Sequence, residues 1–263
     1  MKKKLVALAT LLGAVVLVSC ELNETPQQDL ISEATLSKIR AMGFSIENVQ
    51  RTGGGYLVEG DIVLHDHDLN KTHDHKNLRI AEVEQYRTFN LVKNLPRTIT
   101  VSTSGRNVTT ALSNAVNAAI ARYNAENLGI TFQRVSSNGN IDISVVNTRQ
   151  YIASAGFPDS NGNPYPTISY SRNYTNYSAG FMTTVIAHEI GHCIGFRHTD
   201  YMNRSYSCGS GGNEGQETSG VGAVHIPGTP TGPDAASWML ACLSSTTDRP
   251  FNSNDKVALD YLY

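Results

Sequence analysis

The chain has 263 residues, of which 17% are charged and 40% hydrophobic, and this length fits one large domain or a domain with an appendage. Its formal net charge is −2, whereas a surface that binds the phosphates of a nucleic acid carries a strong excess of basic residues, so we expect no nucleic-acid partner. Only the extreme N-terminus holds an apolar run that approaches membrane-spanning length. The sequence is therefore not that of a multi-span membrane protein.

Residues 1–19 have the pattern of a secretory signal. Three lysines precede an apolar run over residues 5–18, and the small residue Ser19 follows it. A single membrane anchor is the alternative, but this run is too short to cross a core about 30 Å thick as a helix. Residues 17–20 are similar to the lipobox of bacterial lipoproteins. That resemblance implies acylation of Cys20 and a periplasmic or surface-exposed location in the cell envelope, whereas ordinary signal cleavage would leave Cys20 as a free thiol.

Export places the remaining thiols in an oxidising compartment. With Cys20 acylated, Cys193, Cys208 and Cys242 remain, and three thiols allow one disulfide and one free cysteine. Cys193–Cys208 closes the shortest loop and is the candidate pair, although the sequence does not rank the three possible pairings.

Residues 20–95 are expected to form the lipid anchor, a tether and a possible prosegment. A polar, turn-rich stretch over 21–30 is typical of a tether, and apolar spacing predicts a helix over 32–42 that ends at Gly43. Alternating residues predict a strand over 56–64. Four of the eight histidines follow within residues 65–75. They could bind a second metal ion, but alternating His and Asp is more typical of a solvated loop.

Residues 96–263 have the pattern of a compact α/β domain, which we expect to be the catalytic domain. Alternating apolar residues predict strands near 99–101, 130–132, 141–145 and 167–170, and a helical face runs from Leu112 to Tyr123. Residues 178–194 are apolar almost all round, which predicts a buried helix. After irregular chain over 205–234, a helix ends the sequence, with Asn254 as its candidate cap.

The segment over residues 188–198, His-Glu-Ile-Gly-His-Cys-Ile-Gly-Phe-Arg-His, carries the chemistry. On a helix, His188 and His192 project from one face a turn apart, so their imidazoles can bind one zinc ion. Glu189 is rotated by about 100° from His188. It lies near such a metal without facing it and can hold the water that the metal polarises. Two buried helical histidines can also be hydrogen-bonded core residues, but this five-residue pattern rarely arises by chance.

His198 is the candidate third ligand, and a regular helix cannot supply it. Six residues beyond His192 correspond to a rise of ~9 Å along the axis. The helix must therefore end and the chain turn back, and Gly195 permits this because glycine adopts a positive φ freely. Three histidine ligands leave one position open for water, as in catalytic zinc sites.

The spacing H-E-x-x-H-x-x-G-x-x-H resembles the signature of the metzincin zinc endopeptidases. Its form HEIGHCIGFRH resembles the bacterial dual-action HEIGH metallopeptidases, and the similarity extends loosely over residues 96–263. The resemblance implies an α/β (α+β) fold: a twisted mixed sheet with a backing helix and an active-site helix, and an irregular C-terminal subdomain that ends in a helix.

Met239, within Ser237-Trp238-Met239, is similar to the Met-turn of metzincins; a plain core methionine is the alternative. Astacins and serralysins place a tyrosine two residues after this methionine as a movable zinc ligand. Ala241 occupies that position here, so the chain either lacks such a tyrosine ligand or supplies the same function from another residue.

Residues 58–62, Val-Glu-Gly-Asp-Ile, resemble the Phe-x-Gly-Asp motif of astacin propeptides, where the aspartate takes the water position on zinc and silences the enzyme. Val58 departs from the aromatic residue of that motif. A carboxylate is a good zinc ligand, and Gly60 permits close approach of the backbone. Asp61 is thus a possible zymogen switch, or equally a turn residue in a small β element.

Together these features predict an exported, lipid-anchored zinc endopeptidase that hydrolyses peptide bonds in protein or peptide substrates. Glu189 would take a proton from water and later protonate the leaving amine. The alternative is a surface-anchored binding lipoprotein with a structural or vestigial zinc site. Glu189 beside an open three-histidine site argues against that alternative, because structural zinc sites normally have four protein ligands.

Overall fold

The computed structural model describes the chain in four stretches, residues 31–70, 85–214, 222–230 and 232–263. Residues 31–263 form one compact unit, and no helix in the described stretches is long and apolar enough to cross a membrane. The expected signal sequence and Cys20 lie outside the described residues, as do His73 and His75 of the histidine-rich segment.

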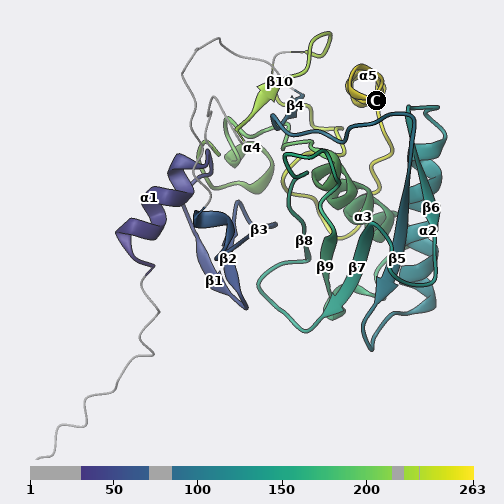
Figure 1. Ribbon diagram of the computed structural model, residues 1–263, viewed down its shortest axis with the longest axis horizontal. Helices are drawn as coiled ribbons and strands as arrows, with labels where there is room; N and C mark the ends of the chain where they lie inside the picture. The colour runs from purple at the N-terminus through teal and green to yellow at the C-terminus, as the bar shows by residue number, and fades with distance from the viewer. Residues whose placement is uncertain (1–30, 71–84, 215–221, 231) are drawn as a thin grey trace, which may run out of the picture. The chain divides into compact units, whose positions relative to one another are not determined.

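A five-stranded mixed sheet forms the main part of the compact unit (Figure 1). Its strands lie in the order β6-β5-β7-β9-β8, and all neighbours run parallel except the short edge strand β8, which is antiparallel to β9. In chain order they are β5 (Arg97–Ser104), β6 (Ile130–Arg134), β7 (Ile141–Val146), β8 (Ala153–Ser154) and β9 (Thr167–Ser171). Buried and half-buried residues alternate along β7, as the sequence predicts. The expected mixed α/β fold class is confirmed.

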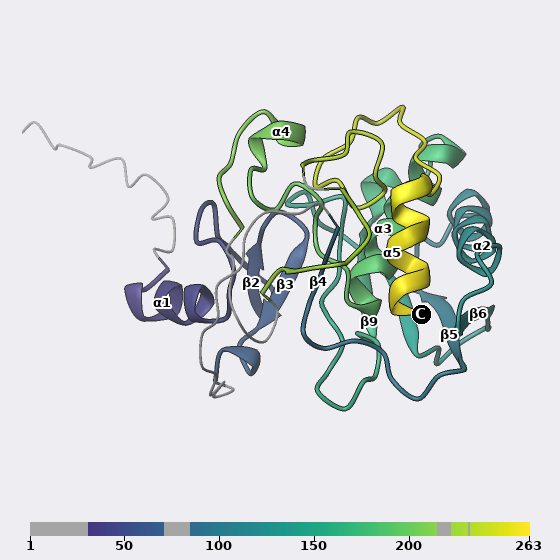
Figure 2. The ribbon, with the colours of Figure 1, turned by 90° about the horizontal axis from the view of Figure 1, so that it is seen from above.

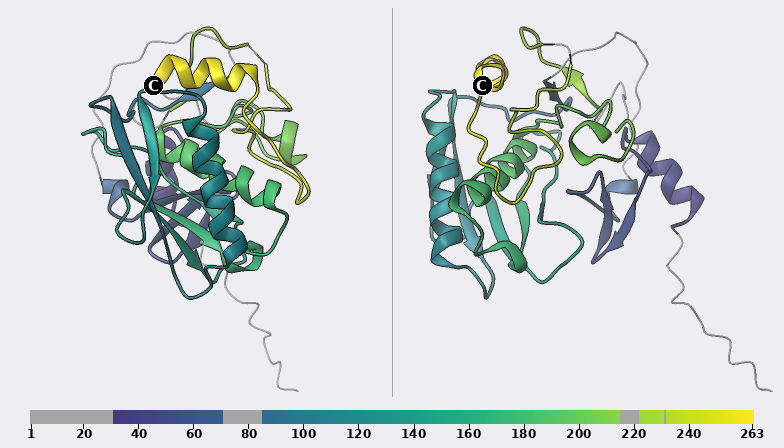
Figure 3. Two further views of the ribbon diagram at one scale, coloured as in Figure 1. Left: turned by 90° about the vertical axis from the view of Figure 1, so that its right-hand side faces the viewer. Right: turned by 180° about the vertical axis from the view of Figure 1, so that it is seen from behind.

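Two helices, α2 (Thr110–Asn124) and α3 (Ala179–Ile194), pack against each other on one face of this sheet (Figure 3). The predicted apolar face of α2 is buried, and Tyr123 donates a hydrogen bond of 2.7 Å to the carbonyl of Ala187 in α3. α3 begins after the capping residue Ser178, and its side chains are buried from Phe181 onwards. This confirms the predicted buried helix and gives the site a rigid support.

The N-terminal part of the compact unit is a small antiparallel sheet with a helix. Its elements are α1 (Glu33–Ala41), β1 (Gln50–Thr52), β2 (Gly55–Val58), β3 (Ile62–His65) and the 3-10 helix η1 (Asp68–Asn70). The helix agrees with the sequence, but the single strand predicted over 56–64 is a hairpin. Glu59 and Gly60 adopt positive φ values of 54° and 87°, so the chain reverses between β2 and β3. Alternation alone does not reveal such a reversal.

The C-terminal part is mostly irregular, as expected, and its last helix lies next to the end of α3 (Figure 2). Its elements are α4 (Ser205–Cys208), β10 (Val224–His225) and α5 (Ser253–Leu262). β10 pairs with the short strand β4 (Tyr86–Arg87) from earlier in the chain, and the 3-10 helix η2 (Arg172–Tyr174) precedes α3. Asn252, rather than the predicted Asn254, caps α5. It forms a capping box with Asp255, which lies at the third helical position where a reciprocal bond is possible.

The structure corrects the expected disulfide. Cys208 pairs with Cys242, whereas Cys193 is a buried free thiol. Cys193 faces the hydrophobic core from α3 and has no exposed surface, so its thiol is kept away from Cys208 on α4. The bridge instead joins α4 to the chain that follows Met239. The pairing predicted from the shortest loop is therefore wrong, because the burial of Cys193 prevents its thiol from reaching Cys208.

Candidate active site

Helix α3 places His188, Glu189 and His192 in the interior, each less than 5% exposed. The Nδ1 atom of His188 lies 2.8 Å from the carbonyl oxygen of Trp238, and Nδ1 of His192 lies 2.8 Å from that of Phe196. A carbonyl oxygen only accepts hydrogen bonds, so each Nδ1 carries the proton and donates it. Each Nε2 is thereby left with a lone pair that can bind a metal ion.

The chain turns back at Gly195, as the sequence predicts. Gly195 has φ 114°, and its N–H bonds to the carbonyls of Gly191 and His192 at the end of α3. A Cβ atom at this position would lie 2.9 Å from the carbonyl oxygen of Asn90, so glycine is required by both conformation and space. The turn brings Nε2 of His198 to 3.2 Å from Nε2 of His192.

Asp61 reaches the same point from the turn of the β2–β3 hairpin. Its Oδ2 atom lies 3.0 Å from Nε2 of His198 and 3.6 Å from Nε2 of His188. One possible ligand atom from each of Asp61, His188, His192 and His198 lies within 4.8 Å of the corresponding atoms of the other three. Three histidines of one short segment and an aspartate from a distant hairpin thus converge in an arrangement that could hold a metal ion.

The polar atoms at this point fit a bound cation. Two imidazole nitrogens 3.2 Å apart repel each other unless a proton or a metal ion lies between them. Oδ1 of Asp61 and Oε2 of Glu189 are buried without a hydrogen-bond partner. Burial lowers the pKa of His192 well below its ordinary value, which favours the neutral imidazole that a metal needs. Around His198 the carboxylates of Asp61 and Glu214 outweigh burial and raise its pKa, so their field favours positive charge.

Met239 is fully buried and packs against the active-site helix. Its Sδ atom would lie 2.5 Å from a Cβ atom at Gly191, which explains the glycine inside the motif. The carbonyl of Met239 accepts a hydrogen bond of 2.9 Å from the N–H of Thr199, the residue after His198. Met239 therefore joins the helix to the returning loop, the position that a Met-turn would require.

A buried carboxylate that sequence reasoning missed, Glu214, contacts the third histidine. Its Oε1 atom lies 2.7 Å from Nδ1 of His198 and 2.6 Å from Nη1 of Arg204. Despite burial, the neighbouring His198 and Arg204 lower the pKa of Glu214 to about 2, so it is ionised. Glu214 lies 16 residues after His198, beyond the short helix α4, and no local spacing pattern links the two residues.

The residues just before the expected catalytic domain support the returning loop. The N–H of Thr88 donates to the carbonyl of Gly195, and the N–H of Arg197 donates to the carbonyl of Tyr86, both at 2.8 Å. Gln85 is buried and donates a hydrogen bond of 2.7 Å to Asp255. Experiments on the site therefore need the full chain rather than residues 96–263 alone.

A cavity of about 220 Å³ adjoins Glu189 and His188. The hairpin turn lines one part of it through Gly60 and Asp61. Apolar side chains from α3, the β8 edge and the chain after Met239 form much of the remaining wall, including Val185, Ile152 and Leu243. A side chain could therefore enter next to the candidate catalytic carboxylate.

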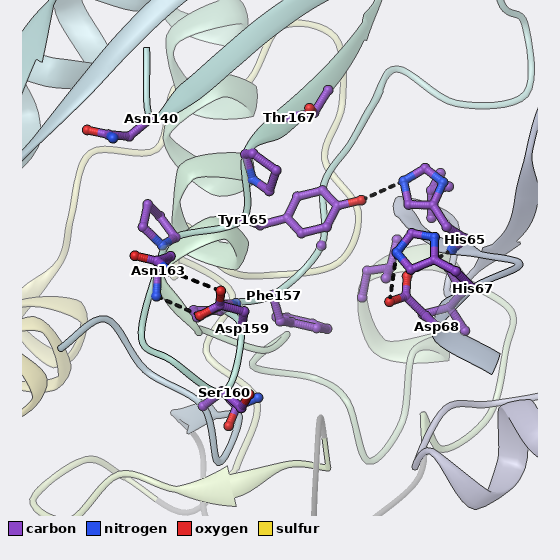
Figure 4. Close-up of a pocket in the computed structure, with 18 of the residues that line it drawn as sticks. His65, His67, Asp68, Asn140, Phe157, Asp159, Ser160, Asn163, Tyr165 and Thr167 are labelled. Atoms are coloured by element: carbon purple, nitrogen blue, oxygen red, sulfur yellow. Dashed lines mark hydrogen bonds and ion pairs between the residues drawn. The ribbon is translucent and has the colours of Figure 1, made fainter. Parts of the chain in front are cut away.

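A larger cavity of about 680 Å³ is lined by the β2–β3 hairpin and by the loop over residues 156–167 (Figure 4). There Nε2 of His65 lies 2.9 Å from the hydroxyl of Tyr165, and Nε2 of His67 lies 3.4 Å from Oδ1 of Asp68. Within the described residues, no metal-ligand group includes either histidine. The described residues thus give no support to a second metal site at His65 and His67, and His73 and His75 lie outside them.

The sequence model of the dual-action HEIGH metallo-peptidases matches residues 56–263, and the chain belongs to this family of metallopeptidases. The match includes the hairpin with Asp61 as well as the histidine motif. Two solved structures of myroilysin are similar at 16% and 15% identity, with TM-scores of 0.42 and 0.40. They cover 66% and 64% of this chain and 96% and 83% of their own. A search of curated proteins found no match.

Proposed function

We propose that the chain is a zinc-dependent endopeptidase whose site is closed by Asp61 in the structure described here. The observation that supports this most directly is the convergence of three imidazole Nε2 atoms next to the buried carboxylate of Glu189. His188, His192 and His198 would hold the metal. Zinc suits a set of three histidines and one oxygen ligand, and family membership already implies a metallopeptidase.

Zinc bound at this point would polarise the scissile carbonyl and lower the pKa of a water molecule. Glu189 would do the proton transfer. Its Oε2 atom is buried without a partner, so it can accept a proton from the attacking water. Burial and the nearby Asp61 raise the pKa of Glu189 well above its ordinary value, and a base of raised pKa can hold that proton until the leaving amine takes it.

Substrate would bind along the sheet edge that the hairpin now occupies. The N–H of Ala155 donates to the carbonyl of Asp61 at 2.9 Å, and the N–H of Val63 donates to the carbonyl of Ala155 at 3.2 Å. Residues after β8 thus pair with the hairpin as with an added strand. An extended peptide would need the same backbone groups, so hairpin and substrate would compete.

Latency follows from this competition. Asp61 would offer its carboxylate to the metal in place of water. The neighbouring His198 and the other histidines hold the pKa of Asp61 well below its ordinary value despite burial, so the carboxylate is ionised. The full chain would therefore be nearly inactive until the turn moves.

Asp61 also supports a second function, because three histidines and one aspartate make the four-ligand set of a structural zinc site. A binding lipoprotein is that second function.

Cleavage of unfolded casein by the full chain carrying Asp61→Ala tests both functions. The peptidase proposal expects cleavage that stops on zinc removal and returns when zinc is added. Adding Glu189→Gln should lower the rate by at least about 10²-fold, the usual contribution of a positioned base, while zinc stays bound. Undiminished cleavage with Glu189→Gln would show that the general base is wrong. Bound zinc with no cleavage by Asp61→Ala would favour the structural site.

Export and lipid anchoring remain part of the proposal, supported by the sequence of residues 1–20. Cleavage before Cys20 and acylation would tether the peptidase to the cell envelope. Mass spectrometry of the N-terminal peptide should show a lipid on Cys20, and Cys20→Ala should release the protein from the membrane fraction. An unmodified thiol on Cys20 in the exported protein would contradict the anchor.

A further inference from the structure

The three histidines of the site differ in what holds their Nδ1 atoms. His188 and His192 each donate to an uncharged backbone carbonyl. His198 instead faces the carboxylate of Glu214, with 2.7 Å between Nδ1 and Oε1. Both side chains are completely buried, so no water screens this contact.

Glu214 is itself held from two sides. Arg204 Nη1 donates to Oε1 of Glu214 at 2.6 Å, and Arg197 Nη2 lies 3.7 Å from its Oε2. Arg197 is fully buried, while Arg204 is mostly buried and also donates to the carbonyl of Glu59. Arg204 therefore fixes where the carboxylate points, while the positive charge of Arg197, whose closer carboxylate partner is Glu59 at 3.1 Å, helps to keep Glu214 ionised.

We propose that Glu214 is the positioning residue for the third metal ligand. The proposal rests on the proposed function, because it takes the histidine cluster to be a zinc site. By accepting the Nδ1 proton, Glu214 sets the tautomer that leaves Nε2 of His198 as the ligand atom, and it fixes the ring plane. His198 has greater need of such support than the two helical histidines, because it lies on irregular chain beyond the end of α3.

The negative charge of Glu214 adds a second effect. A carboxylate on Nδ1 makes Nε2 a stronger electron donor and attracts the cation through a dry interior. Backbone carbonyls at the other two histidines supply orientation but no net charge. Loss of Glu214 should therefore lower zinc affinity by about 10- to 100-fold, the usual effect of removing such a partner.

Two variants of the full chain separate orientation from charge, and both are made with Asp61→Ala so that the hairpin carboxylate cannot compensate. In Glu214→Gln, the amide oxygen can take the place of Oε1 and keep both hydrogen bonds, while the charge is lost. Glu214→Ala removes both. We expect zinc affinity, measured by competition with a fluorescent chelator, to fall about 10-fold in the first and about 100-fold in the second.

Asp200→Asn is the matched control. Asp200 is a fully buried carboxylate two residues after His198, and it accepts hydrogen bonds from Ala241 and Ser207 rather than from an imidazole. Its replacement should leave zinc affinity unchanged. The Nδ1–H proton resonance of His198 in the zinc-bound chain provides a second measurement. It should move upfield in Glu214→Gln and stay in place in Asp200→Asn, which a general loss of stability would not produce.

Zinc affinity equal to that of the Asp61→Ala parent in both folded Glu214 variants would overturn the proposal, as would an equal loss in Asp200→Asn made in the same parent. If Glu214→Ala does not fold, an unchanged affinity and His198 resonance in Glu214→Gln would still overturn it. Failure of the parent Asp61→Ala chain to bind zinc has a different meaning, because it would overturn the proposed function together with this inference.

Discussion

Replacing Asp61 with alanine should activate the full chain without any trimming. The carboxylate of Asp61 lies 3.0 Å from Nε2 of His198, whereas the two backbone bonds between the hairpin and Ala155 do not depend on its side chain. Removal therefore deletes this hydrogen-bonded contact, together with the longer contact of 3.6 Å to His188, and leaves the strand pairing in place. A hydrogen bond to a charged group contributes about 1.5–3 kcal/mol, which corresponds to a roughly 10- to 150-fold larger open population.

The rate of casein cleavage at matched zinc content measures this gain, because cleavage requires the open site. Asp66→Ala is the control variant. Asp66 follows the same hairpin and pairs with Arg51 at 2.9 Å in an exposed position, so its loss should not activate the chain. Equal cleavage rates for wild type and Asp61→Ala would refute the switch, and the hairpin would then be a stable part of the fold.

Three further outcomes test the site and its support. His198→Ala should lower zinc affinity at least about 10-fold while circular dichroism shows α3 intact; full affinity would remove His198 from the ligand set. Gly195 has φ 114°, and a Cβ atom there would lie 2.9 Å from the carbonyl oxygen of Asn90. Gly195→Val should therefore lower the free energy of unfolding in urea by about 1–3 kcal/mol and also weaken zinc binding; an unchanged unfolding midpoint would contradict this. Burial raises the pKa of Asp255 to about 6, so the folded chain holds that proton more tightly than the unfolded chain. The difference in free energy of unfolding between wild type and Asp255→Asn should therefore fall by about 3 kcal/mol as the pH rises from ~4 to ~6, and then level off. A difference that does not change with pH would contradict this prediction.

Local spacing was sufficient to predict the buried helix α3 and the main strands. Helical repetition puts His188 and His192 on one face, and a glycine six residues after Glu189 ends the helix because only glycine tolerates the required backbone there. Alternating burial along β7 follows from the two-residue period of a strand. In these cases the physical cause acts within a few residues, so the order of residues carries the information.

Some local signals were present but misread. Asn252 and Asp255 have the spacing of a capping box, which identifies the true start of α5, yet Asn254 stood closer to the apolar face. Residues 56–64 were predicted to form one continuous strand, although Gly60 and Asp61 in the middle of this segment are residue types that favour a turn. The edge strand β8 is only two residues long, and so short a run has no recognisable period.

Contacts between distant residues were decided by the tertiary structure alone. The motif predicts His198 as a metal ligand. Its contact with Glu214, which follows the short helix α4, and its contact with Asp61, from a hairpin 137 residues away, are not contained in the motif. Cys208 meets Cys242 rather than Cys193 because the core holds the thiol of Cys193. Such pairings depend on how whole elements pack, and packing depends on burial summed over the chain, which no short window of sequence contains.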